Sequence, residues 1–378
     1  MPPLTPERFL PIIDGTRRDP AARLTRGALA ALAPAYVAGL RLYLAPYRLG
    51  IRRQARLPCS VISVGNLTTG GTGKTPMTQR IAAYLLGEGL RVCVLSRGYR
   101  GAAERGAEIV STADRVLLGA AQAGDEAYML ARLLPGVPVM VGRDRRVTGA
   151  LAAERFAPDA IVLDDGMQFY QLHRDLDVVL LDAAAPFGDG RTLPRGLLRE
   201  PPSHLRRAGV VVLTGAERAG AAGLQRAREQ VGRHARSASL FAADYACVSL
   251  RALDRSLERE VEWLVGRPVA TLCALGNPEA FEEQARRAGG RLVHAARLPD
   301  HHAATLAELN EAIAAAQAAG AEAILVSEKD AVKLPPLNRP LPFYALIARL
   351  RLDNEAAFFA RVLEAAGRPA LTGAEASR

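Results

Sequence analysis

A glycine-rich segment at residues 68–75 carries side chains suited to binding phosphate. It reads Thr68-Thr69-Gly70-Gly71-Thr72-Gly73-Lys74-Thr75. In such a loop, glycines let backbone N–H groups approach phosphate oxygens, and the N-terminus of the following helix favours negative charge. The lysine reaches the β- and γ-phosphates, and the last hydroxyl, here that of Thr75, binds Mg²⁺. The segment therefore predicts a nucleotide-phosphate site that uses Lys74 and a magnesium ion.

The loop departs from the usual P-loop pattern at one position, because Thr68 stands where the first glycine is expected. It looks more like the G-G-x-G-K-T loops of the MinD-like branch of P-loop proteins, although it lacks that branch's extra lysine. The alternative is a glycine-rich turn with a chance Lys-Thr pair. Two observations favour the phosphate site. An apolar run at 59–64 and a helical pattern at 77–86 enclose the loop, and only three of the 49 basic residues are lysines.

Asp164 and Asp165 directly follow the apolar run at 160–163, about 90 residues after the loop. Carboxylates at the end of a strand that neighbours a P-loop hold Mg²⁺ directly or through water. Aspartates at strand ends are also common in ordinary turns. Combined with Lys74 and Thr75, however, they indicate a metal site. The predicted magnesium ligands are therefore Thr75, Asp164 and Asp165.

Other polar residues follow predicted strands or begin a helix, and for these the sequence leaves alternatives. Tyr99 follows a strand, on the rim where open α/β sheets bind ligands. Arg195 and Arg199 could clamp a phosphate or be ordinary surface charges. An acid in a first helical turn, such as Asp125, usually serves the helix dipole. His301 lacks the third ligand group that would make its loop a metal site.

Apolar runs alternate with helical patterns along most of the chain, which is typical of an α/β fold with a mostly parallel sheet. The last element predicted is a strand at 323–326. A chain of 378 residues is long enough for about two domains. We expect a helical segment at 1–56, a P-loop NTPase domain at 57–214, a smaller α/β domain at 215–366 and a disordered tail at 367–378.

Composition excludes several classes of protein. Apolar residues make up 49% of the chain and charged residues 23%, as in folded globular proteins. The four cysteines form no C-x-x-C pair, so neither a zinc site nor a disulfide framework is expected. The net charge of +10 comes without alternation of basic and aromatic residues, so we predict no nucleic-acid partner.

The N-terminal segment at 1–56 is strongly basic. It holds ten arginines against Glu7, Asp14 and Asp19, a surplus of +7 out of the total of +10. The charges flank a nearly charge-free stretch that contains Pro34 and is followed by Arg41, features that argue against a full membrane span. We therefore expect an amphipathic helix at an anionic lipid surface, the alternative being a helix packed on the protein's own core.

Taken together, these segments resemble the tetraacyldisaccharide 4′-kinases, the lipid A 4′-kinases of Gram-negative bacteria, over about residues 10–350. The resemblance implies a peripheral or monotopic enzyme at the cytoplasmic face of the inner membrane. It would transfer the γ-phosphoryl group of ATP to the 4′-hydroxyl of a lipid A disaccharide 1-phosphate, without a required protein partner. The matching segments are residues 64–76, 95–99, 124–126, 164–168, 193–201, 274–278, 299–301 and 327–334.

The resemblance also assigns roles to single residues. Asp125 and His301 match the family's catalytic dyad, and Tyr99 matches a tyrosine used near the nucleotide. Arg199 and Glu200 are expected close to the phosphates. Many members read Asp-Asp-Gly-Phe-Gln-His after the metal-site strand, whereas this chain has Phe169 in place of that histidine, so the histidine's role does not transfer.

A second class of function remains open at this point, a MinD-like switch ATPase that associates with a membrane or partner. It accounts for the glycine-rich loop and the basic N-terminal segment. It leaves Asp125, His301 and the second domain without a role. It also predicts ATP hydrolysis stimulated by a protein, whereas the kinase needs a lipid acceptor.

Overall fold

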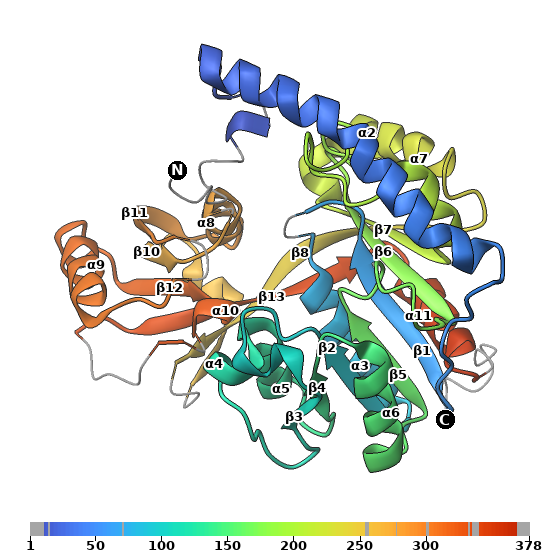
Figure 1. Cartoon of the computed structure of the whole chain (residues 1–378). Coiled ribbons are helices and arrows are strands. Elements are labelled where there is room, and N and C mark those ends of the chain that lie inside the picture. Colours follow the sequence, from blue (N-terminus) through green and yellow to red (C-terminus); the bar gives the residue numbers. More distant parts are fainter. Residues whose placement is uncertain are drawn as a thin grey trace.

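A computed structural model gives the fold shown in Figure 1. It describes residues 11–13, 16–69, 72–253, 257–276, 278–299, 302–331, 333–334 and 340–368. The predicted loop residues Gly70 and Gly71, the predicted catalytic residue His301 and residues 369–378 of the predicted tail lie outside these ranges.

The described residues form one continuous sheet of 13 strands, in the order β11-β10-β12-β13-β8-β7-β6-β1-β5-β2-β4-β3, with β9 paired to β8. Neighbouring strands are parallel except at the pairs β3–β4, β8–β9 and β8–β13. The predicted α/β fold with a mostly parallel sheet is therefore confirmed. The strands span β1 Ser60–Asn66, β2 Val92–Ser96, β3 Glu108–Ser111, β4 Val139–Val141, β5 Ala160–Asp164, β6 Leu176–Asp182, β7 Val210–Thr214, β8 Ser239–Ala252, β9 Glu258–Glu260, β10 Pro268–Cys273, β11 Arg291–Arg297, β12 Ala323–Ser327 and β13 Phe343–Leu352.

Helices cover both faces of this sheet (Figure 1). Helices α3 and α5 pack with β1 and β2 in one apolar core, while α6 packs on the other face of β2. Helix α9 packs on β10 and β11 in the second part of the chain. The helices span α2 Pro20–Arg48, α3 Lys74–Gly87, α4 Ala120–Ala123, α5 Asp125–Leu133, α6 Arg145–Phe156, α7 Ala216–Gly232, α8 Pro278–Arg287, α9 Leu306–Ala318, α10 Glu328–Ala331 and α11 Glu355–Ala365.

The C-terminal helix α11 lies against the P-loop half of the molecule rather than the half that precedes it in the chain. Phe359 stacks on Tyr84 of α3 with ring centroids 3.9 Å apart, and Phe358 meets Phe241 edge-on at 5.5 Å. Both phenylalanines belong to the core that contains α3 and β1. The predicted domain boundary at residue 214 stays a prediction. Residues from beyond this boundary, including Phe358 and Phe359, complete the core of the P-loop half.

Helix α2 begins at Pro20, where the Asp19 side chain caps the helix by accepting from the Ala22 backbone N–H. It continues through Pro34 and Pro46 to Arg48 and runs along one side of the molecule (Figure 1). Only Ala22 and Leu44 of this helix are buried. By length and composition alone, α2 is the single helix of the described residues that could cross a membrane.

Candidate functional site

The predicted phosphate loop lies between β1 and α3, at the carboxyl end of β1. Gly73 has a left-handed backbone (φ 88°) and forms the N-cap of α3, which begins at Lys74. A Cβ at this position would overlap the hydroxyl of Tyr245 from β8, so only glycine fits. Thr72 is held by the buried Asn66, whose side-chain amide donates to the Thr72 hydroxyl at 3.0 Å. The helix N-terminus is thus presented next to the carboxyl ends of the central strands.

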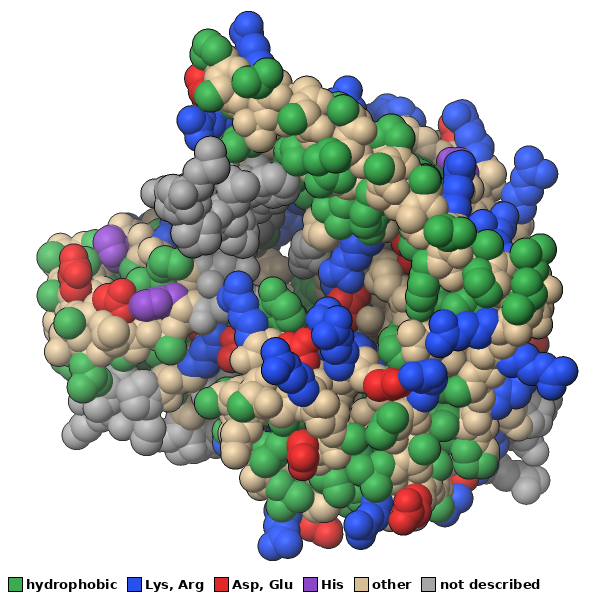
Figure 2. All heavy atoms as spheres, viewed as in Figure 1, with side chains coloured by type: hydrophobic (Ala, Val, Ile, Leu, Met, Phe, Trp, Pro, Cys, Tyr) green, Lys and Arg blue, Asp and Glu red, His purple; other side chains and the backbone are tan. Residues whose placement is uncertain are grey.

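Asp165 lies close to two cationic side chains beside this loop, those of Lys74 and Arg199. Its carboxylate accepts from Arg199 at 2.8 and 3.0 Å and lies 3.8 Å from the Lys74 ammonium. Asp165 itself has a left-handed backbone (φ 50°), which is unusual for a residue other than glycine and is typical of functional sites. Lys74, Asp165 and Arg199, predicted from separate segments, are therefore brought together. Figure 2 shows Lys and Arg side chains gathered around the middle of this face.

Asp164 occupies the end of β5, between β1 and β2, and is almost fully buried. It accepts hydrogen bonds from the Thr78 hydroxyl of α3 at 3.0 Å and the Ser96 hydroxyl of β2 at 3.4 Å. These two hydroxyls were not predicted as site residues. The pairing of β1 with β5 sets Val64 beside Asp164, which brings this carboxylate under the loop that follows β1.

The two carboxylates have opposite electrostatic surroundings. Burial, with the nearby Glu126 and Asp165 charges, raises the pKa of Asp164 above its ordinary value. Burial alone would also raise the pKa of Asp165, but the Lys74 and Arg199 charges lower it below the ordinary value. Asp165 is therefore ionised at neutral pH, whereas Asp164 holds its proton more tightly than an ordinary aspartate.

The loop that carries Arg199 is fastened to the phosphate loop by backbone contacts. Thr68 pairs with Leu198, the Thr69 N–H donates to the Leu197 carbonyl at 2.8 Å, and the Arg199 N–H donates to the Leu67 carbonyl at 2.7 Å. Helix α2 reaches the same loop, because the Tyr36 hydroxyl donates to the Arg199 carbonyl at 2.8 Å. Residues 67–69 thus hold the backbone of the segment 197–199, and the binding of phosphate by Thr68 and Thr69 stays a prediction.

Glu200 differs from its neighbour Arg199, because its carboxylate is only 1% exposed and is already fully engaged. Tyr170 donates to it at 2.6 Å, Arg207 donates to both of its oxygens, and His204 lies 2.6 Å away. His204 in turn meets Arg48 at the end of α2 at 2.8 Å. The expected proximity of Glu200 to the phosphates stays a prediction. In the structure, the buried Glu200 carboxylate connects the segment that carries Arg199 to Tyr170, His204 and Arg207.

Tyr99 lies after β2, as predicted, and the residue is 54% exposed. The guanidinium groups of Arg97 and Arg100 lie 5.9 and 5.4 Å from the ring centroid. Arg100 has a left-handed backbone (φ 61°). An exposed aromatic ring between two cations suits an aromatic or anionic ligand, and contact with a nucleotide remains a prediction.

Asp125, the predicted catalytic acid, begins α5 and is paired with a residue from the second part of the chain. The Lys333 ammonium lies 2.6 Å from its Oδ2. Its predicted partner His301 lies outside the described residues. Lys333 belongs to a segment that the sequence singled out, but its spacing gave no sign that it reaches Asp125.

Arg145, at the start of α6, was also missed. It is only 5% exposed, and its guanidinium lies 5.5 Å from the ring centroid of Phe169, the residue that replaces the family's usual histidine. Burial lowers the pKa of Arg145 even though Asp165 and Asp164 lie near enough to oppose the effect. A buried arginine near two carboxylates adds positive charge to this part of the molecule. At the position where many family members have histidine, this chain has the Phe169 ring packed against the Arg145 guanidinium.

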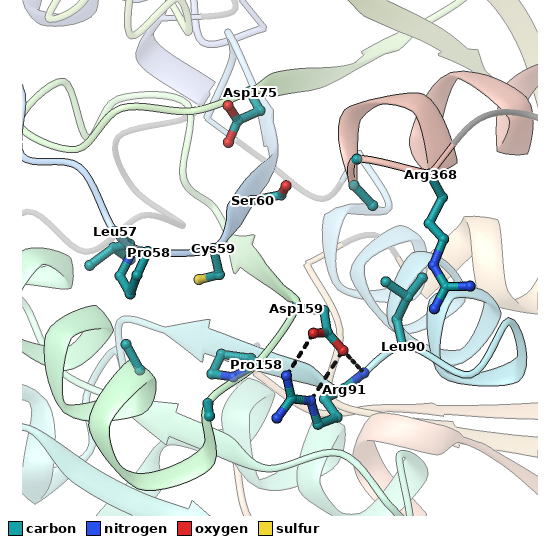
Figure 3. A pocket seen from close by; sticks show the side chains of 14 residues that line it. Leu57, Pro58, Cys59, Ser60, Leu90, Arg91, Pro158, Asp159, Asp175 and Arg368 are labelled. Carbon is teal, nitrogen blue, oxygen red and sulfur yellow. Dashed lines mark hydrogen bonds and ion pairs between the residues drawn. The ribbon is translucent and has the colours of Figure 1, made fainter.

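A cavity of about 800 Å³ lies at the opposite, amino ends of the strands and is lined by Cys59, Arg91, Asp159, Asp175 and Arg368, among others. Figure 3 shows that the Arg91 backbone N–H and the Arg91 guanidinium both donate hydrogen bonds to the Asp159 carboxylate. The Arg91 hydrogen bonds lower the pKa of Asp159, and burial raises the pKa of the Cys59 thiol to about 11. The Cys59 thiol is therefore protonated at neutral pH, and the Asp159 carboxylate is held in an ion pair with Arg91.

Comparison with known proteins identifies relatives over nearly the whole chain. A family described as tetraacyldisaccharide-1-P 4′-kinase matches residues 25–367. A protein of an Anaeromyxobacter species named tetraacyldisaccharide 4′-kinase is 45% identical over 316 residues, covering 82% of each chain. One of the same name from Geobacter sulfurreducens is 40% identical over 341 residues, covering 90% of this chain and 93% of its own.

A solved structure agrees with these relatives. The crystal structure of LpxK from Aquifex aeolicus in complex with ATP superimposes with a TM-score of 0.71 at 30% identity. The match covers 90% of this chain and 99% of that one. Sequence, family and fold comparisons therefore agree, and the chain belongs to the tetraacyldisaccharide 4′-kinase family.

Proposed function

We propose that this protein phosphorylates the 4′-hydroxyl of a tetraacyldisaccharide 1-phosphate, with ATP as the phosphoryl donor. The observation that carries the proposal is the meeting of Lys74 and Arg199 at Asp165, in front of the N-terminus of α3. That arrangement supplies positive charge and backbone N–H groups where a transferring phosphoryl group needs them. The acceptor follows from membership of a family whose members are named for it.

In the proposed reaction, the 4′-oxygen attacks the γ-phosphorus and forms the new O–P bond. The bond to the β–γ bridging oxygen breaks, ADP leaves with that electron pair, and the hydroxyl proton passes to the Asp125 carboxylate. Lys74 and the loop amides stabilise charge on the phosphoryl oxygens, with Arg199 adding to this effect. A sugar hydroxyl is a weak nucleophile near neutral pH, so its positioning and the fixed charges supply most of the rate increase. His301 is proposed to orient Asp125.

Thr75, Asp164 and Asp165 are the proposed Mg²⁺ ligands, and their oxygen donors suit this hard cation. Among the described residues, no three His, Cys, Asp or Glu side chains could hold a metal ion by themselves. This fits Mg²⁺, which proteins commonly bind through one or two carboxylates together with substrate phosphates. When bound, the ion would neutralise charge on the β- and γ-phosphates.

The proposal is tested by transfer of label from γ-³²P-ATP to tetraacyldisaccharide 1-phosphate in detergent micelles containing Mg²⁺. The parent should label the lipid, and Lys74→Ala should lower the turnover number by about 10²–10³-fold, because a fixed charge on the transferring group is lost. Arg80→Ala on the same helix is the matched control. Arg80 pairs with Glu355 of α11 and takes no part in the proposed site.

The two outcomes separate the two classes of function. Labelled lipid that depends on Lys74 supports the kinase. ATP hydrolysis that depends on Lys74 but leaves the lipid unlabelled would instead support the switch ATPase. The family's match over residues 25–367 favours the kinase, because it extends through both the P-loop half and the second part of the chain.

We further propose that α2 lies in the headgroup region at the cytoplasmic face of the inner membrane. Leu24 and Leu42 of this helix are 78% and 76% exposed. Figure 2 shows further hydrophobic side chains along the same helix. Apolar side chains beside arginines are the combination that binds an anionic lipid surface.

Replacing both Leu24 and Leu42 with aspartate should weaken binding to vesicles of anionic phospholipid at least tenfold, because two apolar anchors become charged. Co-sedimentation at low and high salt measures this binding. Val147→Asp combined with Val265→Asp is the control, since these valines are 57% and 68% exposed on other elements. Equal loss in both double variants would assign the effect to net charge and contradict the proposed role of α2.

A further inference from the structure

The ion pair between Lys333 and Asp125 joins two parts of the chain that lie far apart in sequence. The Lys333 Nζ lies 2.6 Å from Asp125 Oδ2, and the two side chains are 9% and 21% exposed. Helix α10, which precedes Lys333, packs against α5, which begins with Asp125 (Figure 1). The pair is therefore a shielded contact between the second part of the chain and the P-loop half.

The backbone that carries Lys333 is fixed by a buried carboxylate. Asp330 accepts from the Ser327 hydroxyl at 2.7 Å and from the Ala274 N–H at 3.1 Å, which ties it to the ends of β12 and β10. The Lys333 N–H donates to the Asp330 carbonyl at 2.9 Å. These hydrogen bonds fix the backbone from which the Lys333 ammonium extends. The ammonium can therefore hold the Asp125 carboxylate in a defined position.

Lysine is also a rare choice in this chain. Only three of the 49 basic residues are lysines, at positions 74, 329 and 333. One of them belongs to the phosphate loop, and another is the partner of Asp125. An ammonium is a compact charge with three donors, whereas a guanidinium is wide and planar. The lysine at 333 thus fits a confined position beside a carboxylate.

The charge of Lys333 would affect how Asp125 acts in the proposed reaction. A carboxylate that accepts the proton of an attacking hydroxyl must approach a highly charged triphosphate, and like charges repel. An ammonium bound to that carboxylate offsets the repulsion and holds the carboxylate in one place. We propose that Lys333 is a positioning residue for phosphoryl transfer, which fixes Asp125 across the interface between the two parts of the chain. This inference rests on the proposed kinase function.

The test is a double-mutant cycle with Lys333→Met and Asp125→Asn, measured by label transfer from γ-³²P-ATP to tetraacyldisaccharide 1-phosphate. Lys333→Met alone should lower kcat by about 10²-fold, the cost of misplacing a reacting group, with KM for ATP unchanged. In the Asp125→Asn background the same change should lower kcat less than twofold, because Lys333 acts only through Asp125. ATP hydrolysis without lipid is measured in parallel.

Arg287→Met is the matched control, because Arg287 of α8 forms an exposed ion pair with Glu217 of α7 at 3.3 Å, away from Asp125. Its kcat should equal that of the parent. Melting temperatures of all variants, with Lys333→Gln as a second neutral variant, identify any loss through misfolding. A kcat loss for Lys333→Met that persists in the Asp125→Asn background would overturn the inference.

The inference and the proposed function fail in different ways. Normal lipid labelling by both the parent and Lys333→Met would refute the role of Lys333 and leave the kinase intact. A parent that labels no lipid, but whose ATP hydrolysis shows the same coupling between Lys333 and Asp125, would refute the lipid acceptor and keep the positioning role.

Discussion

Asp125→Asn is expected to lower the turnover of lipid phosphorylation by about 10²–10⁴-fold, the usual contribution of a general base. The amide keeps the shape of the carboxylate but cannot accept the hydroxyl proton. Asp125 opens α5 at the boundary between the two parts of the chain, where Lys333 contacts it. ATP affinity should stay at the parent value, because Asp125 is not among the proposed phosphate ligands.

Steady-state transfer assays and equilibrium binding of ATP measure these two quantities. Asp114→Asn is the control, the same chemical change at an exposed position in the P-loop half. Turnover within threefold of the parent, with ATP affinity unchanged, would mean that another group accepts the proton.

Glu200→Ala is expected to destabilise the fold by about 3–5 kcal/mol, the usual cost of removing one partner from a buried ion pair. The carboxylate is 1% exposed, and its loss would leave Arg207 without its bidentate acceptor and Tyr170 without its hydrogen-bond partner. Glu200→Gln should lie between the parent and the alanine variant, because an amide accepts hydrogen bonds without the charge. Urea unfolding at pH 7 measures the differences in the free energy of unfolding.

The same carboxylate gives this effect a pH dependence. Burial alone would raise the pKa of Glu200, but the hydrogen bond with His204 and the Arg207 charge lower it from 4.5 to about 2. A lowered pKa in the folded state means that the stabilisation is complete above about pH 4.5 and is lost as the pH falls toward 2. The stability difference between the parent and Glu200→Ala should therefore shrink between pH 5 and pH 3. The exposed Glu217→Ala, tested in the same way, should show little difference at either pH.

The central part of the site was predictable because its signals are local. Lys74 and Thr75 follow a strand and begin a helix, and Asp164 and Asp165 end another strand, so spacing alone predicts a shared edge. The structure places Asp164 and Asp165 beside this loop. Because β1 and β5 are parallel, their carboxyl ends lie at the same edge of the sheet, which brings these residues together.

Other features could not be predicted, because they depend on contacts between distant segments. No local pattern announces that Lys333 reaches Asp125 or that Glu200 is enclosed by Tyr170 and Arg207. Arg145 looks like any charged residue at the start of a helix until burial is known. Strand β13 and helix α11 were missed altogether, and both join packing that only the complete fold defines.

Helix α11 follows all the other named elements in chain order, and this has a consequence during synthesis. Domains generally fold as they leave the ribosome, N-terminal parts first. Here the hydrophobic core that contains α3 and β1 lacks Phe358 and Phe359 until α11 has been translated. A nascent chain released before that point would leave Tyr84 of α3 without its stacking partner and the apolar face around it open to water. Chaperone demand and proteolytic sensitivity of truncated chains should therefore rise sharply when translation stops short of α11.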